Sequence, residues 1–343
     1  MRVAVVFNTP HADWNPERHE AQMLSEFAKE KHAEPEMEYQ IGRALQKLGH
    51  DVLLLGVYDD LRDMSKRLAD WKPALVFNAT EAFLANSELD YLIPALLEAE
   101  GYRYTGAPPL ALLVTRNKSM SKKILAYHGV NVPGFASYRV GERPTDKVTL
   151  RFPLIVKPLS TDASEGIAQA SIVHDVSSLV DRVAFVHDRF AQAAIAEEYI
   201  EGRELYATII GNGDSVEILP IVEMTFDTAG SRPEDRIATR SAKWDLGYRE
   251  RRGIKNVFAR RMAKATKDRL QEISLISYRA FWLRDYARID VRLAADGQIW
   301  FIEANANPFL SEGHDSAESA RKAGMNYPAF IQRIVDLAMS REP

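Results

Sequence analysis

The sequence predicts an α/β fold in its first part and an α+β arrangement after it, spread over more than one structural unit. Three observations support this prediction. The chain has 343 residues, which exceeds the usual size of one compact domain. Apolar, β-branched runs alternate with helical patterns up to about residue 128, and extended segments dominate after that point. We therefore expect two or three units that share a cleft.

The first unit, expected over residues 1–115, is a parallel sheet covered by helices. Continuous apolar runs suit strands that are buried on both faces, and such runs occur at residues 2–7, 51–56 and 74–77. Helical patterns between them end at Gly49 and Gly101, and glycine favours helix C-termini. Strands that alternate with helices predict a Rossmann-like unit, in which ligands bind beyond the carboxyl ends of the strands.

Two further units are expected over residues 116–193 and 194–343. Predicted helices cover residues 109–128, 177–190 and 259–283, and predicted strands cover residues 154–157, 167–171 and 194–199. A hairpin is predicted to join residues 204–211 to residues 217–224 across Asn212-Gly213, which is a strong turn signal. Residues 227–256 are polar and lack clear periodicity, so we expect a mobile loop there that closes over a site.

Composition and charge exclude several classes of function. The formal net charge is -4 and the sequence pI is about 6.1, and no basic tract suited to nucleic acid is present. The chain has no cysteine, which excludes disulfides and cysteine-ligated metals. The opening apolar run at residues 3–7 is too short for a signal peptide or a membrane span. We therefore expect a cytoplasmic protein without nucleic-acid or membrane partners.

The segment from residue 288 to residue 305 is the most informative part of the chain. If Asp296-Gly297 forms a two-residue turn, Asp290 lies opposite Glu303 and Arg288 lies opposite Asn305. The two-residue period of a strand then places all four side chains on one face. The other face is predicted to be apolar and to carry Ile289, Val291, Leu293, Trp300 and Ile302.

Two carboxylates that face each other across a hairpin repel unless a cation lies between them. Magnesium prefers oxygen ligands and commonly takes one or two carboxylates together with substrate phosphates. Asp290, Glu303 and the amide oxygen of Asn305 are thus predicted metal ligands, with Arg288 placed to bind an anion. Alternatively, Arg288 and Arg292 neutralise the two acids in a surface network of ion pairs.

A lysine at the end of a predicted strand could contact nucleotide phosphates. Lys157 follows an apolar run, and the polar loop of residues 160–166 comes after it. Small residues such as Ser164 and Gly166 let backbone amides approach phosphates closely. An ordinary turn after a strand has the same composition. Because neither a P-loop nor a nicotinamide-type glycine fingerprint is present, any ATP site must have another design.

The order of these elements resembles the D-alanine-D-alanine ligase branch of the ATP-grasp superfamily, from about Asn78 to the end of the chain. Four groups of residues carry the resemblance: Asn117-Lys118 with Lys122, Val156-Lys157-Pro158 with the serine-glycine loop, the run from Glu197 to Glu204, and Arg288-Ile289-Asp290 with Glu303-Ala304-Asn305. The resemblance implies an ATP-grasp fold that follows a Rossmann-like unit, and a homodimer as the default assembly.

The resemblance also implies roles for individual residues. It assigns the phosphates of ATP to Lys118, Lys157, Ser164 and Gly166, the adenine to Glu197, Glu198 and Ile200, and the ribose to Glu204. It assigns magnesium, for which manganese can substitute, to Asp290, Glu303 and Asn305. Arg288 would stabilise the transferring phosphoryl group, and Lys243 in the closing loop would add a phosphate contact. The implied activity is ATP-dependent joining of a carboxylate to an amine through an acyl phosphate.

Both predicted amino-acid pockets depart from the family pattern. Glu17-Arg18 is only a partial echo of the acidic motif that follows the first strand in the family. His314-Asp315 stands where the family has a Ser-Leu pair. We therefore expect amino acids or small peptides other than D-alanine twice, with Glu17 and His314 as candidate substrate contacts. A nucleotide-binding regulatory protein and a phosphotransferase are the alternative functions.

Overall fold

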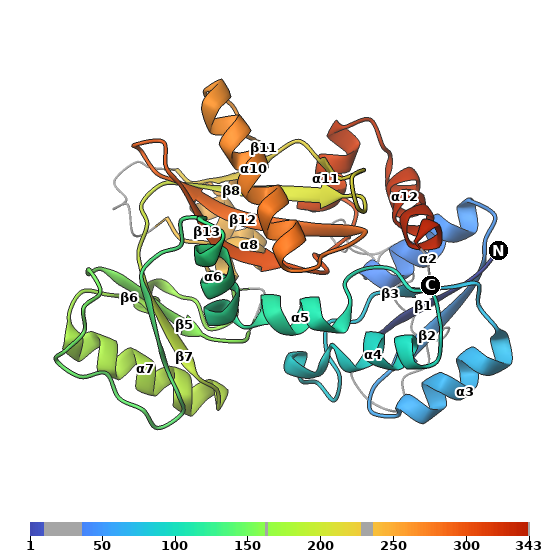
Figure 1. Ribbon diagram of the computed structural model, residues 1–343, viewed down its shortest axis with the longest axis horizontal. Coiled ribbons are helices and arrows are strands. Elements are labelled where there is room, and N and C mark those ends of the chain that lie inside the picture. Colours follow the sequence, from blue (N-terminus) through green and yellow to red (C-terminus); the bar gives the residue numbers. More distant parts are fainter. Residues whose placement is uncertain (10–35, 162–163, 228–235, 342–343) are drawn as a thin grey trace.

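The computed structural model describes residues 1–9, 36–161, 164–227 and 236–341, and it confirms a mixed α/β fold with three sheets (Figure 1). The N-terminal sheet is parallel and has β1 between its two neighbours: β1(Arg2–Asn8), β2(Asp51–Val57) and β3(Leu75–Asn78). Helices α2(Met37–Lys47), α3(Leu61–Trp71) and α4(Leu92–Ala99) accompany it. Because all three strands fall where apolar runs predicted them, the Rossmann-like part of the prediction is confirmed.

The helix predicted over residues 109–128 is two helices rather than one. Helix α5(Pro109–Arg116) ends at Asn117, and α6(Lys118–Tyr127) begins directly after it. Asn117 has extended backbone dihedrals, and its side chain accepts a hydrogen bond from the N–H of Met120 (3.0 Å). An asparagine that caps a helix in this way requires non-helical backbone, so it interrupts the apolar period. The break places Lys118 in the first turn of α6.

The second sheet is antiparallel and is covered by α7(Val176–Phe190). Its strands, in spatial order, are β4(Phe135–Tyr138), β7(Ala194–Glu198), β5(Leu154–Pro158) and β6(Ile172–Val173). The strand predicted at residues 167–171 is wrong, because residues 169–171 form a 3-10 helix and the strand follows it. The boundary proposed between residues 193 and 194 falls just ahead of β7. This boundary would assign β7 to the third unit, although β7 pairs with β5 in the second sheet.

The third sheet is antiparallel and holds most of the predicted site. Its main order is β11(Lys255–Phe258), β10(Val222–Thr225), β8(Arg203–Ile210), β12(Tyr286–Leu293) and β13(Ile299–Asn305), and β9(Glu217–Ile218) pairs with β8. Helix α10(Lys264–Ala280) packs on this sheet, while α12(Tyr327–Ser340) packs against α2 and β3 of the N-terminal unit.

Part of the predicted closing loop has regular structure. Residues 240–251 form two short helices, α8(Arg240–Trp244) and α9(Leu246–Arg251), and residues 255–258 form the edge strand β11. The prediction of a structureless loop over residues 227–256 is therefore wrong for these parts. Asp245 caps α9 by accepting from the N–H of Tyr248 (2.8 Å), which is a local signal the sequence contains.

The predicted pairing of the β12–β13 hairpin is confirmed, although its turn is not. Asp290 pairs with Glu303 and Arg288 pairs with Asn305, but the turn has three residues, since Ala294 donates to Gln298 (2.9 Å). A β-bulge between the turn and the Asp290–Glu303 pair shifts the register by one residue and so restores the predicted pairing. The bulge turns Phe301, rather than Trp300 or Ile302, into the core beside Val291, so the predicted apolar face is wrong at those two positions.

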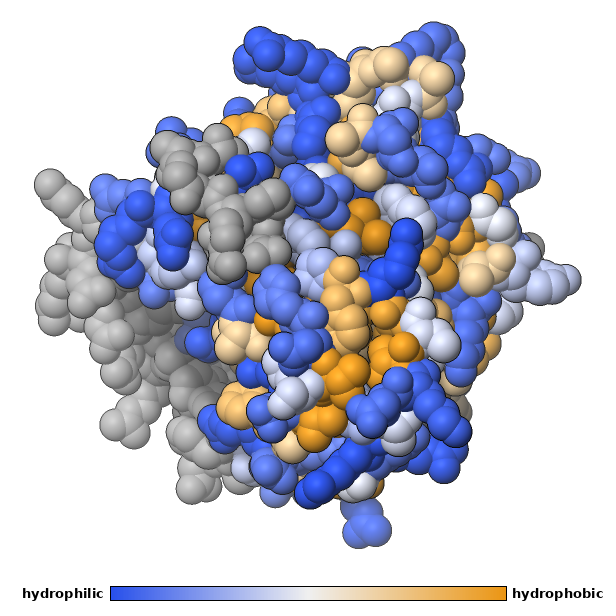
Figure 2. Space-filling model, turned by 90° about the vertical axis from the view of Figure 1, so that its left-hand side faces the viewer, coloured by the Kyte–Doolittle hydropathy of each residue, from blue (hydrophilic) through white to orange (hydrophobic). Residues whose placement is uncertain are grey.

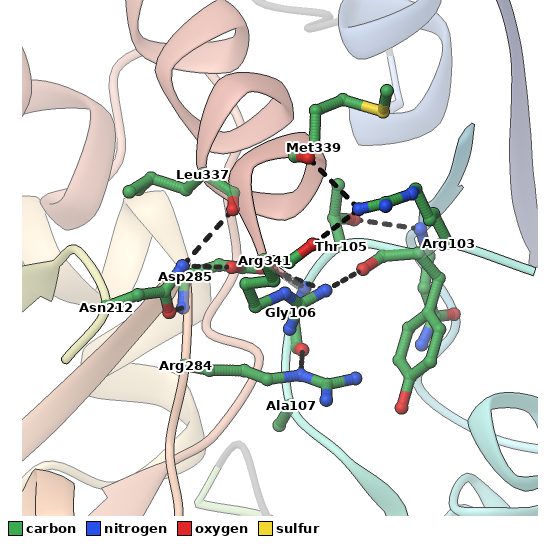
Figure 3. A network of polar contacts seen from close by, with 12 residues as sticks. Arg103, Thr105, Gly106, Ala107, Asn212, Arg284, Asp285, Leu337, Met339 and Arg341 are labelled. Atoms are coloured by element: carbon green, nitrogen blue, oxygen red, sulfur yellow. Dashed lines mark hydrogen bonds and ion pairs between the residues drawn. The ribbon is translucent and has the colours of Figure 1, made fainter. Parts of the chain in front are cut away.

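A buried aspartate joins the N-terminal unit to the third sheet and to the last helix (Figure 3). Asp285 accepts from the N–H of Gly106 (2.8 Å) and from the amide of Asn212 (3.0 Å), and it lies 3.4 Å from the guanidinium of Arg341. The amide of Asn212 also donates to the carbonyl of Leu337 (3.3 Å). Asn212 therefore ties the β8–β9 connection to α12, which its turn signal alone did not predict.

Viewed from the end of the molecule that carries the second sheet, the surface is mainly hydrophilic, with hydrophobic residues gathered near its middle (Figure 2). Within the part of the chain that the structure describes, no helix is long and apolar enough to cross a membrane.

We predict that Asp285→Ala lowers the free energy of unfolding by about 3 to 5 kcal/mol, because it breaks a buried charge pair and leaves buried donors without an acceptor. Urea unfolding followed by circular dichroism measures the change. Asp214→Ala is the matched control, since Asp214 is exposed in the connection that contains Asn212. Equal small losses in both variants would show that the Asp285 network does not stabilise the fold.

Candidate active site

The face of the β12–β13 hairpin carries Arg288, Asp290, Glu303 and Asn305 together. Arg288 donates two hydrogen bonds to Asp290 (2.7 and 2.9 Å), and the amide of Asn305 lies 3.3 Å from the same carboxylate. Lys243 of α8 lies 3.7 Å from Glu303. Arg288 neutralises Asp290, as the ion-pair alternative expected, but this pair is buried rather than on the surface, because Asp290 is only 1% exposed.

Burial and neighbouring charge shift the two carboxylates in opposite directions. Burial raises the pKa of Asp290, although the adjacent Arg288 opposes this. Burial also acts to raise the pKa of Glu303, but Lys243, Lys118 and Lys157 outweigh it and hold the pKa below its usual range. The region therefore combines closely spaced negative groups with a surplus of positive charge, an environment suited to phosphate.

The oxygen donors on this face fit a magnesium ion. Two carboxylates and one amide form a hard-oxygen set, and magnesium usually completes its shell with phosphate and water oxygens. Rotating the amide of Asn305 by half a turn directs its oxygen to the position its nitrogen occupies. Among the described residues, no group of three or more His, Cys, Asp or Glu forms a metal cluster.

A buried glutamate holds two lysines beside the hairpin. Glu197 of β7 lies 3.0 Å from the ammonium of Lys122 and 3.2 Å from that of Lys157. The ammonium of Lys122 also donates to the carbonyl of Ile302 in the bulge (2.7 Å). Burial lowers the pKa of Lys122 to about 8, despite the charge of Glu197. Glu197 is therefore the counter-ion of these two lysines. An adenine bound to its carboxylate would have to bind there together with both lysines.

The predicted phosphate loop lies close to Lys118, which is buried rather than exposed on its helix. The ammonium of Lys118 donates to the carbonyl of Thr161 (2.6 Å). Ser164 and Gly166 both have positive φ, at 58° and 75°. A Cβ atom on Gly166 would lie 2.7 Å from Pro158, so a close approach and a left-handed backbone both require glycine there.

A small cavity of about 60 Å³ collects residues predicted to hold the nucleotide. Among its lining residues are Lys157, Ser164, Glu197, Glu198, Ile200, Glu204, Lys243 and Glu303. The side chain of Glu198 pairs with exposed Arg151 (2.7 Å), and its backbone N–H donates to the carbonyl of Gly134 (2.8 Å). Ile302, which the bulge removes from the core face, also lines this cavity.

Glu204 and Arg292 form a buried pair at the rim of this cavity. Arg292 donates to Glu204 (2.8 Å), and the hydroxyl of Tyr206 donates to the other oxygen of Glu204 (2.9 Å). Arg292 therefore neutralises Glu204 and not the acids of the hairpin, which corrects the proposed network at this residue too. Glu204 is fixed in orientation, with one face left for a ligand hydroxyl.

A larger cavity of about 540 Å³ adjoins the hairpin and is lined by all three predicted units. Representative lining residues are Thr80 and Ser87, Arg116 and Thr161, and Trp244 and Phe309. His314 lies against the rings of Phe309 (4.9 Å) and Trp244 (5.9 Å) and lines this cavity, as Arg288 and Asn305 also do. Lys243 lines both cavities. Glu17, the other predicted substrate contact, lies outside the described residues.

Sequence reasoning assigned no role to three residues of this region. Lys122 was part of a matching motif, and its position one turn after Lys118 was the signal that could have found it. Tyr206 lies beneath the guanidinium of Arg288, at 4.9 Å from the ring centre. Asp315 lies 3.8 Å from Arg288 and accepts from the amide of Asn256 (2.5 Å). Only the fold brings Tyr206 and Asp315 to the hairpin.

The fold and the arrangement of cations, carboxylates and two cavities define an ATP-grasp ligase. A family model described as D-ala D-ala ligase C-terminus matches residues 124–336. The chain therefore belongs to the D-Ala-D-Ala ligase family, and the predicted resemblance and enzyme class are confirmed.

Individual relatives agree with this assignment. An uncharacterized protein, y4sG, of Sinorhizobium fredii is 34% identical over 87% of this chain and 86% of its own length. A D-alanine–D-alanine ligase of Desulforudis audaxviator is 27% identical over 90% of this chain and 96% of its own. The D-alanine–D-alanine ligase of Bacillus anthracis, solved in complex with ATP, shares the fold with a TM-score of 0.74, at 21% identity over 98% of this chain and 97% of its own.

We predict that Glu197→Gln destabilises the protein by about 3 to 5 kcal/mol at pH 7, because two buried ammoniums then lack their counter-charge. The deficit should shrink at pH 9. In wild type, burial lowers the pKa of Lys122 from 10.5 to about 8, so between pH 8 and pH 10.5 the unfolded chain binds more protons at Lys122 and the free energy of unfolding rises with pH. Without Glu197 the pKa of Lys122 falls further, so this rise begins at a lower pH in the variant and narrows the deficit. Burial acts to lower the pKa of Lys157, but the charges of Glu197 and Glu303 outweigh it and raise this pKa in wild type, and the variant removes the first of these two charges.

Urea unfolding of wild type and variant at both pH values measures this effect. Glu198→Gln is the matched control, because the neighbouring carboxylate pairs with Arg151, whose side chain is 80% exposed and screened by solvent. A Glu197→Gln deficit that is the same at both pH values would rule out the uncompensated lysine as its cause.

Proposed function

We propose that this protein is an ATP-dependent ligase that activates a carboxylate as an acyl phosphate and joins it to an amine, releasing ADP and phosphate. One observation carries the proposal: the paired carboxylates Asp290 and Glu303 share one face with Arg288 at the junction of a small and a large cavity. The small cavity is lined by the residues predicted to contact the nucleotide, and the large cavity has room for substrate molecules.

The positive groups of the site act on the phosphates. Lys118 and Lys157 hold the phosphate chain, with the backbone amides of the Ser164–Gly166 turn beside them. Asp290, Glu303 and Asn305 hold magnesium, which supplies positive charge to the phosphoryl oxygens. Arg288 and Lys243 lie beside these ligands, where they stabilise the negative charge that develops during transfer.

Positioning and exclusion of water complete the role of the chain. Carboxylate and amine do not condense in water, whereas an acyl phosphate has a good leaving group that hydrolysis would waste. Arg288 faces the large cavity, so the same guanidinium can stabilise the oxyanion formed when the amine attacks the acyl carbon. Helix α8 brings Lys243 and Trp244 to the boundary of the cavity and limits the access of water.

The donor set distinguishes this proposal from two other functions. A regulatory protein that only binds a nucleotide does not need an arginine paired with a metal-binding carboxylate at a second cavity. A phosphotransferase would use the same hairpin face and release a stable phosphorylated product. A homodimer, a cytoplasmic location and replacement of magnesium by manganese remain predictions.

We predict that Asp290→Asn and Glu303→Gln each lower ATP-dependent ADP release on the order of 100-fold or more, because each removes a carboxylate that would hold magnesium, whose positive charge stabilises the transferring phosphoryl group. The assay supplies ATP, magnesium and pooled D- and L-amino acids and short peptides, and mass spectrometry identifies products. The expected product has the mass of two substrates minus water.

Folding of both variants is checked by circular dichroism before activity is compared. Wild-type rates in both variants would contradict the proposed role of the hairpin. ATP binding without ADP release from any pool would favour a nucleotide-binding protein, and a stable phosphorylated product would favour a phosphotransferase.

A further inference from the structure

A second chamber opens from the large cavity at the edge of the third sheet. It has a volume of about 550 Å³ and lies against α8, α9, β11 and the start of α11(Asp315–Lys322). The residues that line both chambers are Lys243, Trp244, Arg249, Asn256, His314 and Asp315. A molecule bound beside Arg288 can therefore continue into the second chamber.

One wall of the second chamber carries apolar side chains that are partly exposed to water. Trp244 is 42% exposed, Leu246 is 69% exposed and Val257 is 40% exposed, and all three line it. Exposed apolar residues gathered at the mouth of a catalytic cavity are typical of a binding surface. A substrate the size of one amino acid would remain beside Arg288 and leave these side chains in water.

The edge of the sheet in this chamber offers backbone hydrogen bonds. In the described part of the chain, β11 pairs only with β10 and is the last strand of its sheet. The N–H of Ala259 donates to the carbonyl of Ile221, so alternation along the ladder directs the backbone groups of Asn256 and Phe258 away from β10. An extended peptide can pair with such an edge strand.

The charge of Asp315 favours a peptide over a free amino acid. Asp315 lies between Arg288 (3.8 Å) and Asn256 of β11 (2.5 Å), so it joins the catalytic arginine to the edge strand. The carboxylate of a free amino acid lies close to its amine and would approach Asp315, where like charges repel. A peptide presents a neutral amide at the same place.

We propose that the amine substrate is a peptide, whose terminal amino group enters beside Arg288 while its body pairs with β11 and covers Leu246 and Val257. This inference rests on the proposed ligase function. It assigns specificity to the second chamber, which the metal-binding face of the hairpin does not determine.

The test compares amine substrates under ATP, magnesium and a pool of D- and L-amino acids as carboxylates, and mass spectrometry separates the product of each added amine from products of the pool alone. The amines are alanine, alaninamide, Ala-Leu amide and Ala-Leu-Leu amide, in both configurations of the first residue, with an N-acetylated tripeptide as the blocked control. We expect kcat/KM to rise at least about tenfold from alanine to the tripeptide amide, as partial burial of an apolar side chain allows. N-methylation of the inner peptide bond should lower kcat/KM severalfold.

Two variants test the location of the peptide. Val257→Asp should lower kcat/KM for the tripeptide amide about tenfold more than for alanine. Val140→Asp is the matched control, since Val140 is 60% exposed in a turn of the second unit, and it should leave the ratio unchanged. ADP release with equal kcat/KM for all amines, or equal effects of both variants, would overturn the peptide inference and leave the ligase. No amine-dependent ADP release from any mixture would overturn both proposals.

Discussion

The dense positive charge beside the β12–β13 hairpin is the constraint on which the rest of the site depends. Five cations lie in this region, Lys118, Lys122, Lys157, Lys243 and Arg288, and three carboxylates offset part of their charge, Glu197, Asp290 and Glu303. Cations this close repel each other strongly when water is absent. The fold holds these cations because each carboxylate comes from a different strand. Glu197 contacts Lys122 and Lys157, Asp290 contacts Arg288, and Glu303 lies near Lys243. Negative phosphates add to this balance, so the site is electrostatically prepared for a nucleotide before one is bound.

The strands could be predicted because apolar periodicity reports burial directly. The pairing of Asp290 with Glu303 was also predicted, but for a partly wrong reason. The true turn is one residue longer than Asp296-Gly297, and a bulge at Ile302 compensates for it. Pattern alone could not place that bulge, because Phe301 and Ile302 are both apolar and either could face the core. The bulge has a structural role, since it presents the carbonyl of Ile302 to Lys122 and its side chain to the small cavity.

Other differences arise where a local signal competed with a longer pattern. The apolar period across residues 109–128 predicted one helix, while the capping side chain of Asn117 divides it and brings Lys118 to Thr161. The polar composition of residues 227–256 predicted a loop, although caps at Thr239 and Asp245 start two short helices there. In both cases a single capping residue determined the position of a functional lysine. Glu197 was predicted to contact adenine, but its two lysine partners come from other elements and no spacing in the sequence reveals them.

The catalytic face and the substrate chambers depend on different parts of the fold, and this separation explains how the family pattern can be kept in one and lost in the other. The hairpin face is determined by the register of β12 with the edge strand β13, so a change there would disturb the core that contains Val291 and Phe301. The second chamber is formed by short helices, an edge strand and the start of α11, where side chains can change with little effect on packing. Asp315 connects the two regions through Arg288 and Asn256. Under the proposed function, a substitution of Asp315 is expected to change which amine is accepted while the groups proposed to act on phosphate stay in place.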